Sequence, residues 1–323
     1  TEDPFLFCVH HNDNYPAAKD DLSPNVSLSG RHLGNDFSNK DGWSMYHGQK
    51  VPGFPRHPHR GFETLTVVSK GFIDHADSLG ASARYGNGDA QWLTAGDGIN
   101  HSEMFPLFRQ NGNNKLDFFQ IWLNLPSYNK RVEPNFEMYW EDEIPKISSN
   151  LNGNKNVQVE IITGDYLDFS SPIAPKNSWA SNKKNDVAVW IIRLGRNGKF
   201  ALNDTKSGAK RNLYVLKGSN MEIDGQSISG GSMVTLDSSK NTVIKNLGSK
   251  TKILMLQGVP INEPVVKYGP FVMNTRSEIE QAFYDYNRTE FGGWKWGNSD
   301  PVHGTEPEKF AKLISGKIIK PRK

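Results

Sequence analysis

The sequences GFPRHPHRGFET (residues 53–64) and GINHSE (residues 98–103) each hold two side chains that can bind a metal, two positions apart. These pairs are His57 with His59, and His101 with Glu103. Successive side chains on a β-strand point to opposite faces, so residues two apart share a face. Two neighbouring strands of a barrel could therefore direct all four groups at one interior point. The pattern predicts a β-rich fold around a metal site.

Histidine is unevenly distributed along the chain. Nine histidines are present, and none lies between His101 and His303. A histidine-rich metal centre must therefore lie in the N-terminal half. Three imidazoles and one carboxylate leave about two positions open on a six-coordinate ion, as redox metals that bind oxygen require. Structural zinc usually closes its shell with cysteine, and this chain has only Cys8.

Length and composition limit the class of protein. A chain of 323 residues is long enough for two domains, each with its own core. The net charge of +3 comes from basic residues scattered among acids, so we expect no nucleic-acid partner. No apolar run approaches the ~20 residues of a membrane span, so no membrane partner is expected. A single cysteine excludes an internal disulfide and fits a reducing compartment, which favours a cytoplasmic protein. We expect a monomer, and the sequence does not decide whether the protein binds a protein partner.

The alternation of apolar runs and turn residues indicates the fold class. Runs rich in Val, Ile, Leu, Phe and Tyr, for example at residues 64–68, 118–125 and 187–194, are separated by Gly, Pro, Asn and Asp. This is typical of an all-β sandwich or barrel. The pattern loosens between residues 145 and 186, which predicts a domain boundary near residue 150. The expected parts are an N-terminal metal-binding barrel at 1–150, a second barrel at 151–262 and a C-terminal segment at 263–323 that packs on the barrels.

The second half differs from the first in its chemistry. It repeats the strand-rich outline but has no histidine at a matching place, so no metal is expected there. Residues 277–286 have helical spacing, with Ser277 or Thr275 available to cap the helix start and acids in its first turn. One short helix is expected at this place. The tail at 291–323 is rich in turn residues and is expected to pack as irregular chain across the core.

Four blocks of this sequence closely resemble the pirin family of bicupins. The blocks are HPHRGFET at 57–64, QWLTAG at 91–96, GINHSE at 98–103 and GPFVMNT at 269–275. The sequence DPVHG at 300–304 is similar to the longer bacterial-type members rather than to the shorter animal form. The resemblance spans both expected domains.

The resemblance implies a fold and a cofactor. It implies two stacked cupin barrels of the jelly-roll type, with non-haem iron(II) in the first barrel and none in the second. The family's ligands fall on four positions of this sequence, none of them substituted: His57, His59, His101 and Glu103. The same ligand set also accepts manganese, nickel, cobalt or copper.

The resemblance also implies two alternative functions. Some pirins cleave the flavonol quercetin with dioxygen, which would make this chain a quercetin 2,3-dioxygenase-type enzyme with a phenolic substrate. Animal pirin is described as an iron-dependent transcription coregulator, so a redox switch that binds a protein without turnover is the alternative. The bacterial-type tail favours the enzyme.

Several residues near the motifs have more than one interpretation. Glu63 lies four residues after His59 and shares its parity, so it could bind the metal, although Gly61 could bulge the strand and turn Glu63 away. The family pattern favours Glu103 as ligand and leaves Glu63 as a supporting residue. Glu103 could also be the catalytic base if its bond to the metal is loose, and Glu63 is the alternate base. Phe54, Gln120 and Trp122 are the candidate residues of the substrate pocket, and the alternative for each is that it fills the core of the barrel. His47 and His75 are expected to be ordinary loop or barrel residues, and His10, His11, His32 and His303 have no partner at useful spacing.

Overall fold

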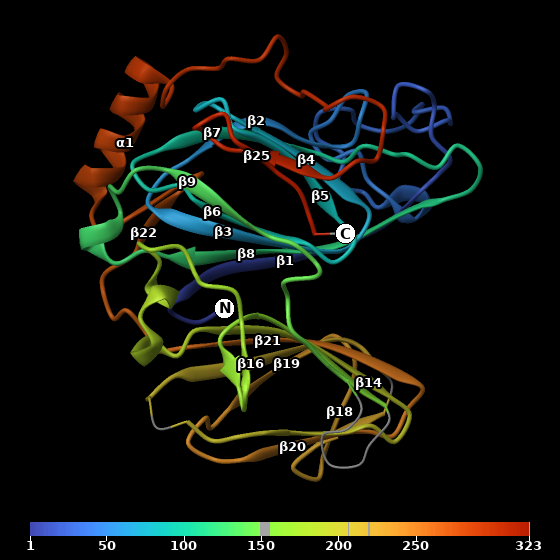
Figure 1. Ribbon diagram of the computed structural model, residues 1–323, viewed down its shortest axis with the longest axis vertical. Helices are drawn as coiled ribbons and strands as arrows, with labels where there is room; N and C mark the ends of the chain where they lie inside the picture. Colours follow the sequence, from blue (N-terminus) through green and yellow to red (C-terminus); the bar gives the residue numbers. More distant parts are fainter. Residues whose placement is uncertain (149–155, 206, 219, 323) are drawn as a thin grey trace. The chain divides into compact units, whose positions relative to one another are not determined.

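The computed structural model describes residues 1–148, 156–205, 207–218 and 220–322 (Figure 1). The chain forms two compact units. The histidine-rich unit contains Phe7–Asp142 and Glu263–Lys323, and the second unit contains Thr1–Leu6 and Glu143–Asn262. The expected boundary at residue 150 lies outside the described residues.

Two β-sheets built from antiparallel pairs make up the histidine-rich unit. The first has the order β1-β8-β3-β6-β9 and the second the order β2-β7-β4-β5-β24-β25. The first sheet consists of β1 (Phe5–Tyr15), β8 (Asn114–Asn124), β3 (Phe62–Lys70), β6 (Ala90–Thr94) and β9 (Asn135–Tyr139). The second consists of β2 (Gly53–His59), β7 (Ile99–Met104), β4 (Phe72–Asp77), β5 (Ser82–Gly86), β24 (Phe310–Lys312) and β25 (Ile318–Ile319). Buried side chains from both sheets, such as Val68, Phe118, Tyr85 and Ile99, form one apolar core.

A glycine allows the chain to pass from one sheet to the other directly after the HPH motif. Only Arg60 and Gly61 separate β2 from β3, which belong to different sheets. Gly61 has φ +85°, and a Cβ at this position would lie 2.0 Å from the carbonyl oxygen of Val272. No other residue type fits this close approach and this backbone conformation without strain.

The segment after residue 262 contributes a hairpin, a helix and two further strands to the histidine-rich unit. β22 (Val266–Tyr268) pairs with β23 (Phe271–Met273), and α1 (Arg276–Thr289) follows. The expected helix is confirmed. Thr275 is its N-cap and forms a capping box with Glu278. The expectation of a wholly irregular tail is wrong, because β24 pairs with both β5 and β25.

The second unit also consists of strands, which confirms the all-β class. The described part of this unit contains three sheets and short 3-10 helices. The first sheet has the order β10 (Lys146–Ser148), β11 (Val157–Thr163), β14 (Ala188–Gly195), β21 (Lys250–Gly258), β16 (Lys210–Lys217) and β19 (Ser232–Leu236). The second has the order β15 (Lys199–Leu202), β20 (Thr242–Asn246), β17 (Met221–Ile223) and β18 (Gln226–Ile228), and the third pairs β12 (Asp165–Tyr166) with β13 (Phe169–Ser170). Apolar side chains such as Trp190, Phe200 and Met255 fill its interior.

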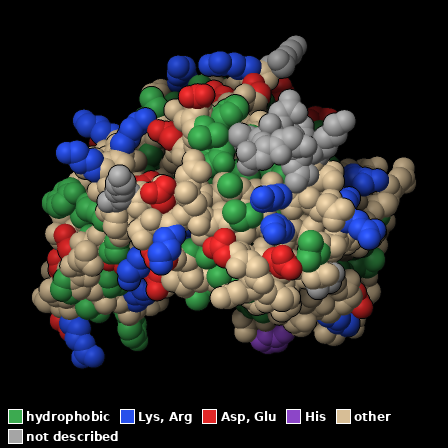
Figure 2. All heavy atoms as spheres, turned by 90° about the horizontal axis from the view of Figure 1, so that it is seen from below, with side chains coloured by type: hydrophobic (Ala, Val, Ile, Leu, Met, Phe, Trp, Pro, Cys, Tyr) green, Lys and Arg blue, Asp and Glu red, His purple; other side chains and the backbone are tan. Residues whose placement is uncertain are grey.

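The surface carries mixed charge. On the face seen in Figure 2, lysine and arginine side chains lie among acidic and hydrophobic ones. Within the described ranges, no helix has the length and apolarity needed to cross a membrane.

A buried lysine connects three parts of the histidine-rich unit. The Lys130 ammonium donates hydrogen bonds to the carbonyl oxygens of Gly61 (2.8 Å) and Val272 (3.1 Å) and to Oδ1 of Asn124 (2.6 Å). Lys130 is 1 % exposed, so water does not replace these bonds. The cation therefore ties the turn after the HPH motif to the end of β8 and to β23.

We expect Lys130→Met to destabilise the protein by about 3 kcal/mol or more, because it leaves three buried oxygens without a donor. The free energy of unfolding in urea measures the effect. Lys50→Met is the matched control, since the Lys50 side chain is 66 % exposed and its ion pair with Asp21 contributes roughly 0–1 kcal/mol. Equal stability of the two variants would contradict this role for Lys130.

Candidate metal centre

The pairing of β2 with β7 brings the two ligand motifs together. In their antiparallel register His57 lies opposite His101 and His59 lies opposite Ile99, with an irregularity between Phe54 and His57. Because alternate side chains share a face, the three imidazoles point to the same side. Their ligand nitrogens all lie within 4.8 Å of one another. In the part of the chain that the structure describes, this is the one such group of three or more possible ligands.

The imidazoles of this cluster have nitrogens available for a cation. Nδ1 of His57 lies 2.8 Å from the carbonyl oxygen of Pro55, which can only accept, so Nδ1 carries the proton and Nε2 keeps its lone pair. Neither ring nitrogen of His101 has a hydrogen-bond partner. The two ring nitrogens of His59 form no hydrogen bond of normal geometry either. The nearby Pro270 carbonyl nevertheless opposes the lowering of the His59 pKa by burial.

Burial keeps the cluster uncharged at neutral pH. It lowers the pKa of His57 to about 4. Burial, together with the neighbouring imidazoles, lowers the pKa of His101 well below its usual range, and the same two causes act on His59. Neutral imidazole is the form that binds metals. Buried nitrogens without partners are unfavourable unless a ligand satisfies them, so the residues present fit a metal ion.

Glu103 lies beside this cluster. Its Oε2 is 3.9 Å from Nε2 of His101 and accepts a hydrogen bond of 2.8 Å from the Gln120 amide. Oε1 accepts a longer bond of 3.4 Å from the Thr66 hydroxyl. Burial raises the pKa of the Glu103 carboxyl, and the Gln120 hydrogen bond opposes this shift. Glu103 does not belong to the group whose ligand atoms all lie within 4.8 Å of one another, but its carboxylate borders that group at His101.

The structure does not bring Glu63 into the cluster. Its Oε1 accepts a hydrogen bond of 2.8 Å from the Thr94 hydroxyl, on the neighbouring strand β6. Thr66 reaches Glu103 from the other face of β3, since residues three apart on a strand point to opposite sides. The parity that suggested Glu63 as a ligand fails because the chain changes sheets at Gly61, between the motif and β3.

The expected pocket residues surround the candidate ligands. The Phe54 ring lies 6.3 Å from that of His57, and the Trp122 ring lies 5.5 Å from that of His59. Gln120 bonds Glu103 and also lies 3.4 Å from the indole nitrogen of Trp122. Two aromatic walls and one amide therefore border the cluster.

Sequence reasoning missed other histidines close to this site. The ring of His75 lies 5.4 Å from that of His101, and its Nε2 is 3.1 Å from Oδ2 of Asp77. The His11 ring is stacked on Phe118 at 4.5 Å and meets the edge of Phe54 at 5.8 Å. Strand alternation around each residue could place them on an inward face, but only the pairing of distant strands brings His75 to the cluster and His11 against Phe54.

The chain is thus an all-β protein of two units, one of which contains a histidine cluster that could hold a metal ion. The pirin family model matches residues 3–123, and the model of the pirin C-terminal cupin domain matches residues 189–292. The chain belongs to the pirin family.

Proteins similar to this chain match it over most of both sequences. A Pseudomonas aeruginosa protein, whose name assigns it provisionally to the quercetin 2,3-dioxygenases, is 33% identical over 75% of this chain and 80% of its own. Human pirin is 31% identical over 76% of this chain and 80% of its own. A solved structure titled quercetin 2,3-dioxygenase, from Acinetobacter baumannii, has a TM-score of 0.71 and 28% identity over 90% of this chain and 87% of that one.

We expect iron(II), added anaerobically at about 100 times its dissociation constant, to stabilise the folded protein by about 2.7 kcal/mol. His101→Ala should abolish this increase, because it removes a central nitrogen of the cluster. Thermal unfolding with iron(II) and with chelator measures the effect. His32→Ala, a change at an exposed histidine, serves as the control and should retain the increase. A full increase in the His101 variant would show that the metal binds elsewhere.

Proposed function

We propose that this protein is a quercetin 2,3-dioxygenase-type enzyme that uses iron(II) to cleave a flavonol or related phenolic compound with dioxygen. The residues proposed to hold the metal are His57, His59, His101 and Glu103. The observation that supports this most strongly is the convergence of three neutral imidazoles whose ligand nitrogens lie within 4.8 Å of one another. A site of three nitrogens and one carboxylate leaves coordination positions open for small molecules.

Iron(II), when bound, supplies Lewis acidity and the redox chemistry of dioxygen. The protein's own groups bind the substrate and move its proton. Phe54 and Trp122 offer aromatic faces for a flat ring system, next to His57 and His59. Apolar walls also exclude water from the reacting atoms.

Glu103 is the proposed base for the hydroxyl proton of the substrate. Burial by itself raises the pKa of its carboxyl. A bound cation would oppose this shift, so the carboxylate can accept the proton only when its bond to the metal is loose. Gln120 donates to Oε2 and Thr66 to Oε1, so both oxygens are held in defined positions. Gln120 is therefore proposed as a positioning residue for the base.

We expect His101→Ala to reduce oxygen uptake with quercetin by on the order of 100-fold or more, because even groups that only support metal ligands contribute about 10–100-fold. Gln120→Leu should reduce it by roughly 10-fold for the same reason. The measurement is oxygen consumption by anaerobically iron(II)-loaded protein after addition of substrate and dioxygen.

A matched pair of variants tests the assignment of the base. Glu103→Gln should remove most of the oxygen uptake. Glu63→Gln should retain it within about twofold, since its amide oxygen can still accept the Thr94 hydroxyl hydrogen bond. Absence of uptake by the wild-type protein with iron bound would contradict the enzyme. Partner binding that changes with iron oxidation state would then support the redox-switch alternative.

A further inference from the structure

A hollow is bordered both by His57, one of the candidate metal ligands, and by a long loop. It has a volume of about 570 Å³ and is bordered by three segments that are distant in the sequence. These are the loop residues Gly34, His47 and Gln49, the β2 residues Pro55, Arg56 and His57, and the tail residues Ser299 and Asp300. His47 and His57 therefore border the same hollow.

His47 is held in one orientation at this hollow. Its Nδ1 lies 2.7 Å from the carbonyl oxygen of Gly34, and a carbonyl can only accept, so Nδ1 carries the proton. The other nitrogen, Nε2, is then a hydrogen-bond acceptor in the neutral ring. Phe37 and Phe54 meet this ring edge-on at 5.1 and 5.6 Å.

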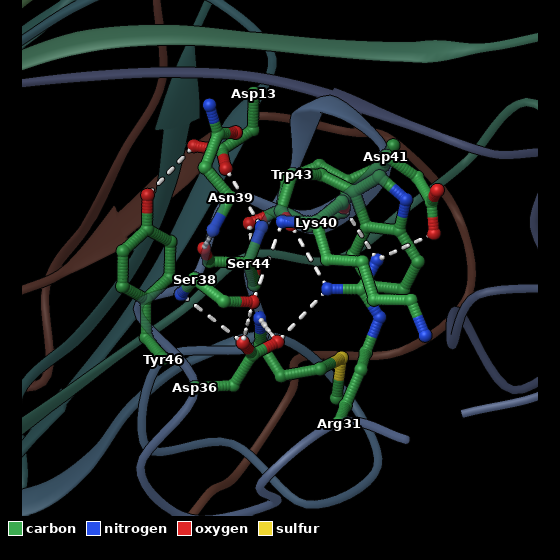
Figure 3. A network of polar contacts seen from close by, with 12 residues as sticks. Asp13, Arg31, Asp36, Ser38, Asn39, Lys40, Asp41, Trp43, Ser44 and Tyr46 are labelled. Atoms are coloured by element: carbon green, nitrogen blue, oxygen red, sulfur yellow. Dashed lines mark hydrogen bonds and ion pairs between the residues drawn. The ribbon is translucent and has the colours of Figure 1, made fainter. Parts of the chain in front are cut away.

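The loop that carries His47 is built rigidly before any ligand arrives (Figure 3). The Arg31 guanidinium forms an ion pair of 2.9 Å with Asp36 and lies 3.3 Å above the ring centre of Trp43. The Arg31 and Asp36 side chains are 2 % and 1 % exposed. Asp36 and Tyr46 exchange two backbone hydrogen bonds of 2.8 and 2.9 Å, which close the loop directly before His47.

A second contact fixes the loop to strand β1. The Asp13 carboxylate accepts hydrogen bonds from the Tyr46 hydroxyl at 2.9 Å and from the Ser44 amide at 3.0 Å (Figure 3). Tyr46 is in turn stacked on Phe54 at 5.2 Å. A ligand that binds beside His47 therefore loses little affinity to ordering of the loop.

We propose that His47 is a specificity-determining residue whose Nε2 accepts a hydrogen bond from a hydroxyl group of the substrate, away from the group that meets the metal. The exposed Phe37 and the Phe54 ring both meet the His47 ring, so a flat aromatic compound that bonds His47 has apolar side chains beside it. The substrate class is therefore a planar aromatic compound with hydroxyl groups at both ends. This inference rests on the proposed function, because it takes His57 as part of the substrate site.

Two flavonols test the inference, because quercetin carries hydroxyl groups on all rings and 3-hydroxyflavone carries only the one nearest the proposed metal. Their dissociation constants are measured by calorimetry with anaerobic, iron(II)-loaded protein. His47→Phe keeps a ring but removes the acceptor, and should weaken quercetin binding about tenfold, the effect of one lost hydrogen bond. Binding of 3-hydroxyflavone should not change.

Two further variants separate hydrogen bonding from packing. His47→Gln restores an acceptor and should recover most of the affinity for quercetin. His32→Phe introduces the same ring on an exposed part of the same loop that does not border the hollow, and should change neither affinity. Equal weakening of both flavonols by His47→Phe, or no weakening of either, would overturn the inference.

The outcome also distinguishes this inference from the proposed function. Oxygen uptake by the wild-type protein with no selective effect of His47→Phe would contradict the role of His47 alone. Selective binding without any oxygen uptake would support His47 as a recognition residue and contradict the enzyme. Absence of quercetin binding by the wild-type protein would overturn the inference outright.

Discussion

The register between β2 and β7 is the constraint on which the candidate site depends. It places His57 directly opposite His101, so the two motifs meet although about 40 residues separate them in the chain. A slip of one residue would turn every side chain of one strand to the other face and would disperse the imidazoles. The surrounding core strengthens this register, because β7 is buried along its whole length and the partly buried Phe54 of β2 packs against the same core.

The rest of the histidine-rich unit supports this pair of strands from both ends. After the HPH motif, Gly61 lets the chain change sheets, and Lys130 holds the turn to β8 and β23. Before the motif, the buried Arg31–Asp36 pair fixes the loop that leads to β2. The site is thus assembled by long-range contacts, while its chemistry depends on desolvation: burial keeps the imidazoles neutral and makes Glu103 more basic.

Local patterns in the sequence predicted the strands, the one helix and the ligand pairs. The HPH and HSE spacings depend only on strand alternation, and the Thr275 capping box depends only on residues within one turn of helix. Features that arise from distant pairing were not predictable. The even spacing between His59 and Glu63 was misleading, because the chain changes sheets between these two residues. The tail strand β24 forms only where β5 offers an edge. His11, His47 and His75 gain their positions from segments far away in the chain.

X-ray absorption at the iron edge of the iron(II)-loaded protein tests the central claim most directly, because it reports the atoms bound to the metal without requiring turnover. The account predicts a shell with three imidazole nitrogens and at least one carboxylate oxygen, with one imidazole lost in His101→Ala and the oxygen changed in Glu103→Gln. A shell of oxygens alone, or one that neither substitution alters, would contradict it.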